Sequence, residues 1–335
     1  MVVEESRSGT GGLRARREDL VRDDRWQGLL LDVTAAPRCP GIVVEVTGGG
    51  RLQIRQGPTV VFLARLDAGR YHVDYRRLPA YDPILPPVRS MDARRMGGGT
   101  ADDRDVRWAY RFADLLTASG AGPLYPGRWL LQPSAPNLRY VEAAASVRQP
   151  AGTAERWSEL LVDDDAGQLD WYIHGGSGLV LTMRPMSRPD DARVKSYRKQ
   201  VRSGTLPPIL LWWVSSLDSY LLLDGHDRLA ACLAEMVEPP LMTLTAVVDA
   251  DEVQRCHAWS VRHHAETTAH IEREISKGTP GAAAALVAER RRLADDLVAP
   301  QLATKPSKAW MLPGGVPQWE RAATLADPVW AANHH

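Results

Sequence analysis

The sequence predicts an α+β protein, with strands concentrated in the first half of the chain and long helices in the last third. Residues 26–88 contain short apolar runs separated by glycine-rich turns, a pattern typical of antiparallel hairpins. Residues 251–276 and 280–298 have the composition and spacing of helices. Between these regions, residues 220–236 read as a strand, a glycine turn and a helix.

The N-terminal half is expected to be β-rich. Residues 1–25 carry dense mixed charge with almost no apolar periodicity, so we expect them to be disordered. Gly48–Gly50 is interpreted as a hairpin turn; a phosphate loop is the alternative, but the Lys-Ser/Thr and the helix of such loops do not follow. Strands are expected at 29–33, 41–46, 52–55, 59–66 and 71–75.

The middle of the chain combines a linker, short helices and further strands. Residues 89–105, with Gly97–Gly99 amid charges, are expected to form an exposed linker. Asp163–Asp165 is interpreted as a solvated turn with a divalent-ion site as the alternative. His174, in a glycine-rich break, is interpreted as a loop residue with a ligand-facing lid as the alternative. We expect helices at 108–119 and 155–161, strands at 127–131 and 169–173, and an apolar segment at 137–145.

The C-terminal region is expected to be helical and then extended. Within residues 251–276, His263, Glu266 and His270 share one helix face. We interpret this face as solvated, with a metal site as the alternative, because ligands from one helix are normally completed from elsewhere. Residues 300–335 are rich in Pro and Trp and are expected to form an extended tail packed on the body.

Bulk composition limits the possible partners. The formal net charge is +0, from 41 basic and 41 acidic residues, so no general attraction to nucleic acid or membranes is expected. Cys39, Cys232 and Cys256 lack metal-ligand spacing and a pairing pattern, which suggests a reducing, cytoplasmic compartment. No apolar run is long enough to span a bilayer, and the N-terminus does not read as a secretory signal.

The most informative motif is the pentad Asp224-Gly225-His226-Asp227-Arg228. It lies between the strand-like run 220–223 and the helix-like run 229–236. A strand, a glycine turn and a helix N-terminus together form an anion cradle, since free backbone N–H groups and the positive end of the helix dipole point at one spot. Arg228 would add a planar fork of donors suited to phosphate. The alternative is an ordinary Asp-Gly turn with Asp as a helix cap.

The sequence around the pentad resembles the sulfiredoxin/ParB-like superfamily. The resemblance covers about residues 178–248 and rests on four stretches: Arg184 to Ser187, Asp190 to Val201, Leu206 to Trp212, and the pentad. It implies a small mixed sheet with flanking helices, a Gly-x-x-Arg phosphate loop, and ATP lying across that loop and a preceding helix. With it, the chain divides into 1–25, a β-rich domain of unknown role at 26–173, a nucleotide-binding domain at 178–248, a helical extension at 249–299 and the tail at 300–335.

The resemblance also assigns nucleotide-contacting residues. Arg193 stands where sulfiredoxins have a phosphate-binding Lys, and Ser196 matches a Ser of the family. Gln200 stands where the family has Thr. Gly225 and Arg228 match the phosphate loop.

The catalytic positions of sulfiredoxins are not kept. His226 stands where sulfiredoxins have the catalytic Cys, and Asp227 replaces the family His. Sulfinic acid reduction is therefore not expected, because no thiolate can attack a sulfinyl phosphate here. Cys232 lies too far along the helix to substitute.

The Asp-Gly-His start of the pentad instead looks like the ParB-like free serine kinases. That likeness implies an ATP-dependent phosphotransferase acting on a small hydroxyl-bearing acceptor, or a nucleotide hydrolase. Asp224 or Asp227 would hold Mg²⁺ or accept the proton of the hydroxyl, with Asp224 the candidate metal ligand, and His226 would act as acid or base. The upstream glutamate of those kinases has no clear counterpart.

Two other functions stay open. A non-catalytic, ParB-like regulatory or DNA-associated module is the main alternative, and a nuclease is the third. Residues 251–276 carry few arginines and no basic recognition helix is evident, so strong duplex binding is not expected.

Overall fold

A computed structural model describes residues 4–5, 13–22, 24–36, 39–67, 72–134, 153–170, 178–302 and 305–332. The chain forms two compact units: residues 1–245 with 306–335, and residues 246–305. Each unit is described separately below. Among the described residues, no helix is both long and apolar enough to cross a membrane.

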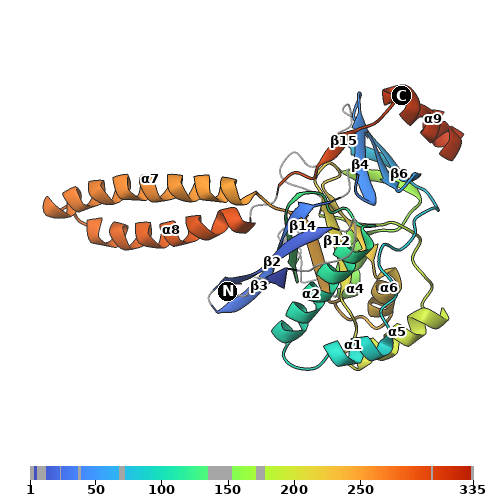
Figure 1. Ribbon diagram of the computed structural model, residues 1–335, viewed down its shortest axis with the longest axis horizontal. Coiled ribbons are helices and arrows are strands. Elements are labelled where there is room, and N and C mark those ends of the chain that lie inside the picture. The colour runs from blue at the N-terminus through green and yellow to red at the C-terminus, as the bar shows by residue number, and fades with distance from the viewer. Residues whose placement is uncertain are drawn as a thin grey trace. The chain divides into compact units, whose positions relative to one another are not determined.

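A mixed sheet runs through the first unit and carries the pentad (Figure 1). Within the described residues it has nine strands, in the spatial order β1 (Glu4–Glu5), β2 (Arg14–Arg22), β3 (Arg25–Ala35), β8 (Gly127–Gln132), β14 (Leu241–Ala246), β12 (Ile209–Val214), β13 (Ser219–Asp224), β11 (Val180–Thr182) and β9 (Leu161–Val162). β12 and β13 are antiparallel, whereas β11 pairs in parallel with both β13 and β9, and β14 in parallel with β12. The α+β class expected from the sequence is confirmed.

A second sheet contains the hairpins that the glycine turns predicted. Its described strands are, in order, β10 (Ala166–Asp170), β7 (His72–Arg77), β6 (Thr59–Asp67), β5 (Arg51–Gln56), β4 (Ile42–Thr47) and β15 (Ala309–Met311). β4 to β7 are consecutive antiparallel neighbours, and Gly49 and Gly50 adopt the positive φ values of 71° and 67° that the turn between β4 and β5 requires. The turn interpretation of Gly48–Gly50 is therefore confirmed.

The helices of the first unit are α1 (Ser90–Met96), α2 (Ala101–Ser119), α4 (Thr153–Leu160), α5 (Ala192–Arg202), α6 (His226–Ala234), α9 (Gly315–Ala326) and α10 (Pro328–Ala332). The prediction of an exposed linker at residues 89–105 is wrong, because α1 and the start of α2 occupy most of this segment. A reciprocal capping box between Thr100 and Asp103 starts α2 directly after the glycines. The α2 face that contains Trp108, Phe112 and Leu116 is buried, as the spacing predicted.

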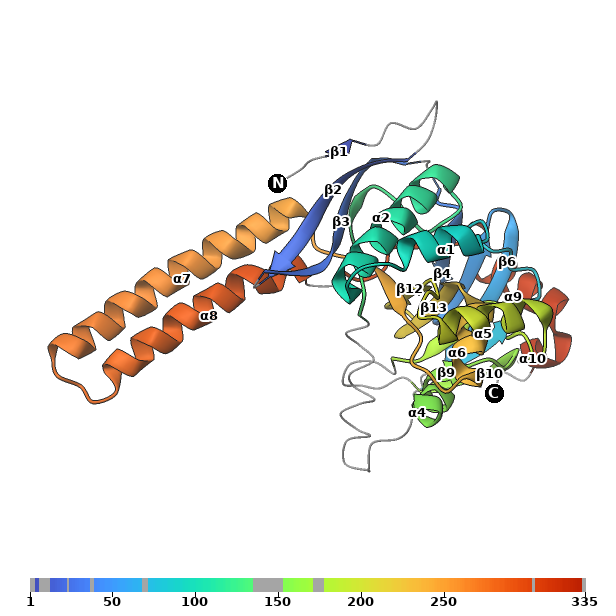
Figure 2. The same ribbon diagram turned by 90° about the horizontal axis from the view of Figure 1, so that it is seen from below.

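The tail is not extended. β15 pairs with β4, and Trp319 and Ala323 of α9 pack on Leu63. Arg65, which is 2% exposed, donates to the carbonyl oxygens of Trp330 and Ala331 and so holds the end of α10. Figure 2 shows α9 and α10 beside the second sheet.

Two more expectations need correction. Residues 14–22 form strand β2, paired along its length with β3, rather than a disordered segment. The separate domain expected at 26–173 does not exist as a unit, because β3, β8 and β9 lie in the same sheet as β11 to β14. The expected strand or apolar segments at 137–145 and 171–173, and His174, lie outside the described residues.

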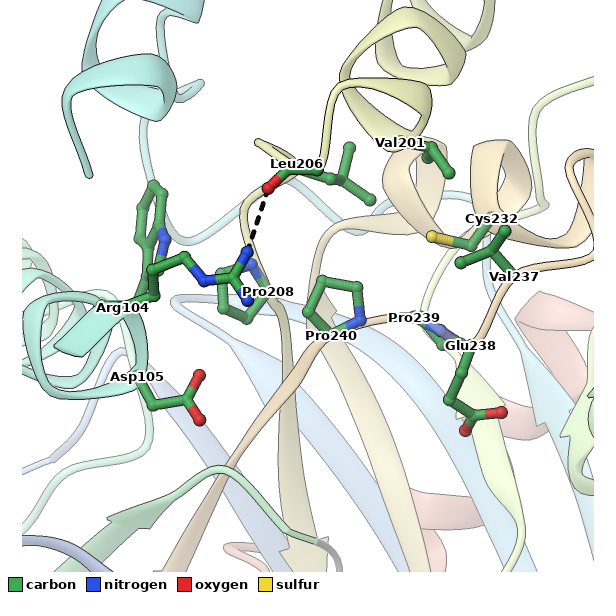
Figure 3. A pocket seen from close by; sticks show the side chains of 12 residues that line it. Arg104, Asp105, Val201, Leu206, Pro208, Cys232, Val237, Glu238, Pro239 and Pro240 are labelled. Carbon is green, nitrogen blue, oxygen red and sulfur yellow. Dashed lines mark hydrogen bonds between the residues drawn. The ribbon is translucent and has the colours of Figure 1, made fainter. Parts of the chain in front are cut away.

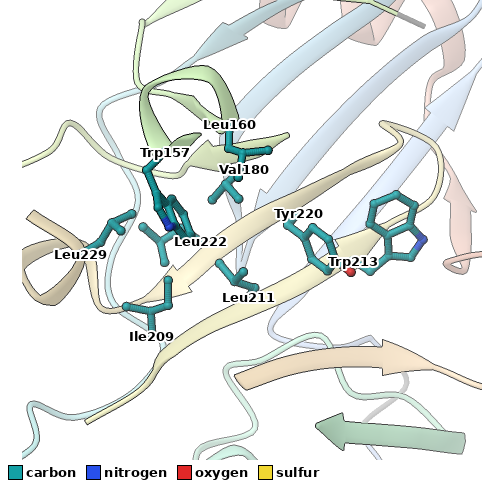
Figure 4. Close-up of a cluster of buried hydrophobic side chains, with 9 residues drawn as sticks. All are labelled: Trp157, Leu160, Val180, Ile209, Leu211, Trp213, Tyr220, Leu222 and Leu229. Atoms are coloured by element: carbon teal, nitrogen blue, oxygen red, sulfur yellow. The ribbon is translucent and has the colours of Figure 1, made fainter. Parts of the chain in front are cut away.

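The core beneath the pentad is dense and apolar. Every residue of β12 is buried, and so are the first five residues of β13. Trp157 of α4 and Leu229 of α6 pack with Leu222 of β13 in one cluster (Figure 4). Truncating a fully buried leucine such as Leu222 in such a cluster costs about 2–5 kcal/mol, so this packing stabilises the strand that ends at Asp224.

The second unit is a helical hairpin of α7 (Ala250–Ser276) and α8 (Ala282–Leu302), drawn in orange in Figure 1. Between these helices, His264 Nδ1 lies 3.2 Å from Oε1 of the buried Glu289. Among the described residues, no group of three His, Cys, Asp or Glu side chains could hold a metal ion. The histidine face of α7 therefore gains no support as a metal site.

Candidate phosphate-binding site

The pentad forms a tight turn between β13 and α6. Asp224 ends the strand, Gly225 occupies the cap position with φ 102° and ψ 20°, and His226 begins the helix. A Cβ atom on residue 225 would lie 2.9 Å from Nη2 of Arg228 and 2.9 Å from Cγ2 of Ile209, so only glycine fits both the conformation and the space. Gly225 has no side chain that could cap α6, and no side-chain cap is present among the described residues, so the first backbone N–H groups of the helix can donate to an oxygen ligand.

Arg228 is buried beneath this turn. Its Nη2 donates to Oδ2 of Asp224 at 2.7 Å and to the carbonyl oxygen of Pro208 at 3.0 Å. Its Nε is buried without a hydrogen-bond partner among the described residues. Burial acts to lower the pKa of Arg228, but the charge of Asp224 outweighs it and the pKa is raised. Arg228 therefore stays charged and neutralises Asp224.

Asp227 is the centre of a second charged group. Its Oδ1 accepts from Nη2 of Arg184 at 2.7 Å and from the hydroxyl of Ser187 at 2.6 Å, and its Oδ2 accepts from Nη1 of Arg193 at 3.4 Å. Burial acts to raise the pKa of Asp227, but Arg184 and Ser187 outweigh it and the pKa is lowered. The carboxylate is therefore ionised, and 63% of the Arg193 side chain remains exposed.

His226 points into the protein and is neutral. Its Nε2 accepts from the backbone N–H of Met183 at 3.2 Å, which places the ring proton on Nδ1. Burial, followed by the charge of Arg184, holds the pKa of His226 well below its usual value. The ring lies 6.1 Å from that of Tyr81, whose hydroxyl donates to the carbonyl oxygen of Leu223 at 2.6 Å.

The charged groups surround a cavity of about 50 Å³. Segments far apart in sequence contribute to it: Pro83 to Pro87, Arg184, the α5 residues Arg193 and Tyr197, and the turn from Leu223 to Arg228. Among its described lining residues, three arginines face two carboxylates, which leaves an excess of one positive charge. With the uncapped start of α6, this arrangement favours an anionic group no larger than a phosphate inside the cavity.

The structure brings together most of the residues that the sequence identified. Arg193, Asp224, Gly225, His226, Asp227 and Arg228 all line the cavity. Ser196 is different: it is exposed on α5 and does not line the cavity. The sequence interpretation missed Arg184 and Tyr197 as site residues, although Arg184 begins the Arg-Pro-Met-Ser stretch that already carried the family resemblance.

A magnesium ion would find limited protein ligation here. Mg²⁺ is usually held by one or two carboxylates together with substrate phosphates. Oδ2 of Asp224 is already paired with Arg228, and both oxygens of Asp227 accept from described donors. Only Oδ1 of Asp224 has no described partner, so the residues fit an ion held by one carboxylate oxygen, with the remaining ligands supplied by phosphate and water.

No protein-family model, curated protein or solved structure matches this chain. The geometry of the site therefore carries the functional argument.

Proposed function

We propose that the cavity at the start of α6 binds the terminal phosphate of a nucleotide, and that the protein is an ATP-dependent phosphotransferase acting on a small hydroxyl-bearing acceptor. One observation carries the binding step. The uncapped N-terminus of α6 opens beside Arg184 and Arg193 in a cavity with excess positive charge. The strand–glycine–helix arrangement also supports relating this region to the sulfiredoxin/ParB-like superfamily.

Each residue of the site would have its own role in binding or catalysis. The N–H groups after Gly225 and the guanidinium of Arg193 bind phosphate oxygens, while Arg184 holds Asp227 in place. Catalysis of phosphoryl transfer is mainly positioning and charge neutralisation, which such a set of donors supplies. Oδ1 of Asp224 is the described carboxylate oxygen best placed to accept the acceptor's proton or to bind Mg²⁺. His226 serves as a neutral, buried support for the loop rather than as the general acid or base.

A non-catalytic nucleotide-binding module is the second candidate, and one observation favours it. Both carboxylates of the pentad are paired with arginines, at 2.7 Å for Asp224 with Arg228 and 2.7 Å for Asp227 with Arg184. Asp227 in particular is a weak base, because Arg184 and Ser187 stabilise its ionised form and lower its pKa. A binding module needs no base and tolerates this arrangement.

Isothermal titration of ATP, ADP and CTP, with and without Mg²⁺, tests the binding step. Arg193→Ala should weaken binding about tenfold or more, since it removes a charge-assisted contact from an exposed side chain. Lys199→Ala, which removes an exposed cation from the same helix outside the cavity, is the matched control and should bind as the wild type does. Absence of nucleotide binding under every condition would overturn the proposal.

Phosphate release and phosphotransfer distinguish the catalytic forms. A transferase shows nucleotide consumption that depends on an added hydroxyl acceptor, a hydrolase shows it without one, and a binding module shows neither while still binding the nucleotide. Asp224→Asn, which replaces the carboxylate with an uncharged amide, should abolish consumption in both catalytic cases.

A further inference from the structure

A larger cavity lies behind the phosphate loop in the same unit (Figure 3). Its volume is about 390 Å³, within the range of about 300–1,000 Å³ typical of small-molecule sites. α2 forms one side, the end of α5 with the loop after it another, and the segment before β14 the third. The walls are mainly apolar, formed by Leu206, Pro208, Pro239 and Pro240.

Two carboxylates, Asp105 and Glu238, line this cavity. Asp105 forms no hydrogen bond or ion pair with any described residue. Burial raises the pKa of its carboxyl group. Oε1 of Glu238 accepts from Arg156 and Trp157, and its Oε2 has no described partner. A partly buried carboxylate without a donor is unfavourable, and a ligand that supplies the donor would relieve it.

Arg104 forms no hydrogen bond with Asp105, although its charge acts to lower the pKa of the Asp105 carboxyl group and partly offsets the effect of burial. Its Nη1 donates to the carbonyl oxygen of Gly204 at 3.1 Å, the bond drawn dashed in Figure 3. Gly204 follows the C-terminus of α5, where backbone carbonyls give a negative potential that suits a guanidinium. Arg104 is therefore held at one edge of the cavity, and the carboxylate beside it is left for a ligand.

We propose that this cavity binds a small, mostly apolar molecule that carries a protonated amine, with the ammonium group beside Asp105. The prolines and Leu206 would bury the apolar part, and the ammonium would donate to the carboxylate. This site is separate from the phosphate cavity: the ring of Pro208 lines it, while the carbonyl oxygen of Pro208 accepts from Arg228. The proposal therefore does not depend on nucleotide binding.

The test uses the full chain and three probes of one shape: phenethylamine, 2-phenylethanol and 3-phenylpropionate. By isothermal titration, phenethylamine should bind most tightly and 3-phenylpropionate least. Asp105→Asn should weaken phenethylamine binding about 10- to 100-fold and leave 2-phenylethanol nearly unchanged, as expected for loss of one charge-assisted hydrogen bond. Asp102→Asn is the matched control, because Asp102 is exposed on the same helix and does not line the cavity.

A second variant locates the binding. Val237 lines the cavity and is 45% exposed, so Val237→Trp can fill the space without replacing a core residue. It should abolish binding of both phenethylamine and 2-phenylethanol while the far-ultraviolet circular dichroism stays unchanged. The proposal is overturned if no probe binds the wild type, if phenethylamine binds Asp105→Asn or Val237→Trp as well as the wild type, or if ATP displaces phenethylamine.

Discussion

The buried Arg228–Asp224 pair should make the stability of the turn between β13 and α6 depend on both charges together. Arg228→Met keeps a long apolar side chain and removes the guanidinium, which leaves Asp224, only 15% exposed, without its 2.7 Å partner. Breaking a buried ion pair from one side costs about 3–5 kcal/mol, because the remaining charge is uncompensated. The carbonyl oxygen of Pro208 loses a donor as well, which adds about 1 kcal/mol.

Removing both charges should recover most of this loss. In Arg228→Met/Asp224→Asn no unpaired charge remains, so we expect it to be within about 1–2 kcal/mol of the wild type, although Arg228→Met and Asp224→Asn are each destabilised more strongly. The coupling energy between the two positions should therefore exceed about 2 kcal/mol.

Urea unfolding followed by tryptophan fluorescence measures these differences. Trp259 is in the second unit and the other tryptophans are in the first, so the signal reports mainly the unit that contains the pair. Arg193→Met is the control: its 3.4 Å pair with Asp227 involves a side chain that is 63% exposed, and its loss should cost less than about 1 kcal/mol. The reasoning is refuted if the double variant is no more stable than the single variants, or if Arg193→Met costs as much as Arg228→Met.

Three further outcomes are expected. In the unfolded chain His226 takes up a proton near its ordinary pKa of 6.5, whereas in the folded protein its pKa lies well below that value. The free energy of unfolding should therefore fall by about 1.4 kcal/mol per pH unit below pH 6.5 until the folded pKa is reached. His226→Gln should lack this slope in urea unfolding at pH 7.5 and 5.5, and an equal loss of stability in the wild type and the variant would contradict the prediction. Gly225→Ala should destabilise the protein by about 1–3 kcal/mol in the same assay, from its φ of 102° and the contact with Arg228. Ellman's reagent should modify the exposed Cys39 and Cys256 in the native protein but react with Cys232 only after unfolding. The Cys232 thiol is buried, and burial raises its pKa to about 12. A fast reaction of all three thiols in the native protein would contradict this buried position.

The turn at the pentad could be predicted because its signals are local. An apolar run, a glycine and a run of helix composition are consecutive in the chain, and the structure has the strand end, the positive φ and the helix start at those residues. Arg184 could not be placed in the same way. It follows β11, which pairs in parallel with β13 so that Thr182 lies opposite Leu222, and such a register is a property of the whole sheet.

The ends of the chain were misinterpreted for different reasons. In β2 the charged residue Arg17 faces the interior, where its Nη2 lies 2.8 Å from Asp114. Buried and exposed residues therefore alternate along β2, but apolar and polar residue types do not, so the sequence does not show the pattern of a strand. In the tail, the richness in Pro and Trp suggested an extended chain, but Pro317 lies in the first turn of α9, where a missing backbone N–H costs nothing. Trp319 then buries against the second sheet, a tertiary contact that composition does not encode.

The role of the loop depends on whether Arg193 can leave Asp227. Asp227 lies in the first turn of α6, where its negative charge complements the positive end of the helix dipole. Arg184 and Ser187 hold that carboxylate at 2.7 and 2.6 Å, so it stays paired without Arg193. The 3.4 Å contact of Arg193 is long and the side chain is mostly exposed, so its guanidinium can turn to a phosphate at little cost. If the turn binds phosphate, Arg193→Ala should reduce the affinity for nucleotide without reducing the stability of the protein. If the affinity is unchanged, Arg193 is not a phosphate ligand and its assignment to the site is refuted.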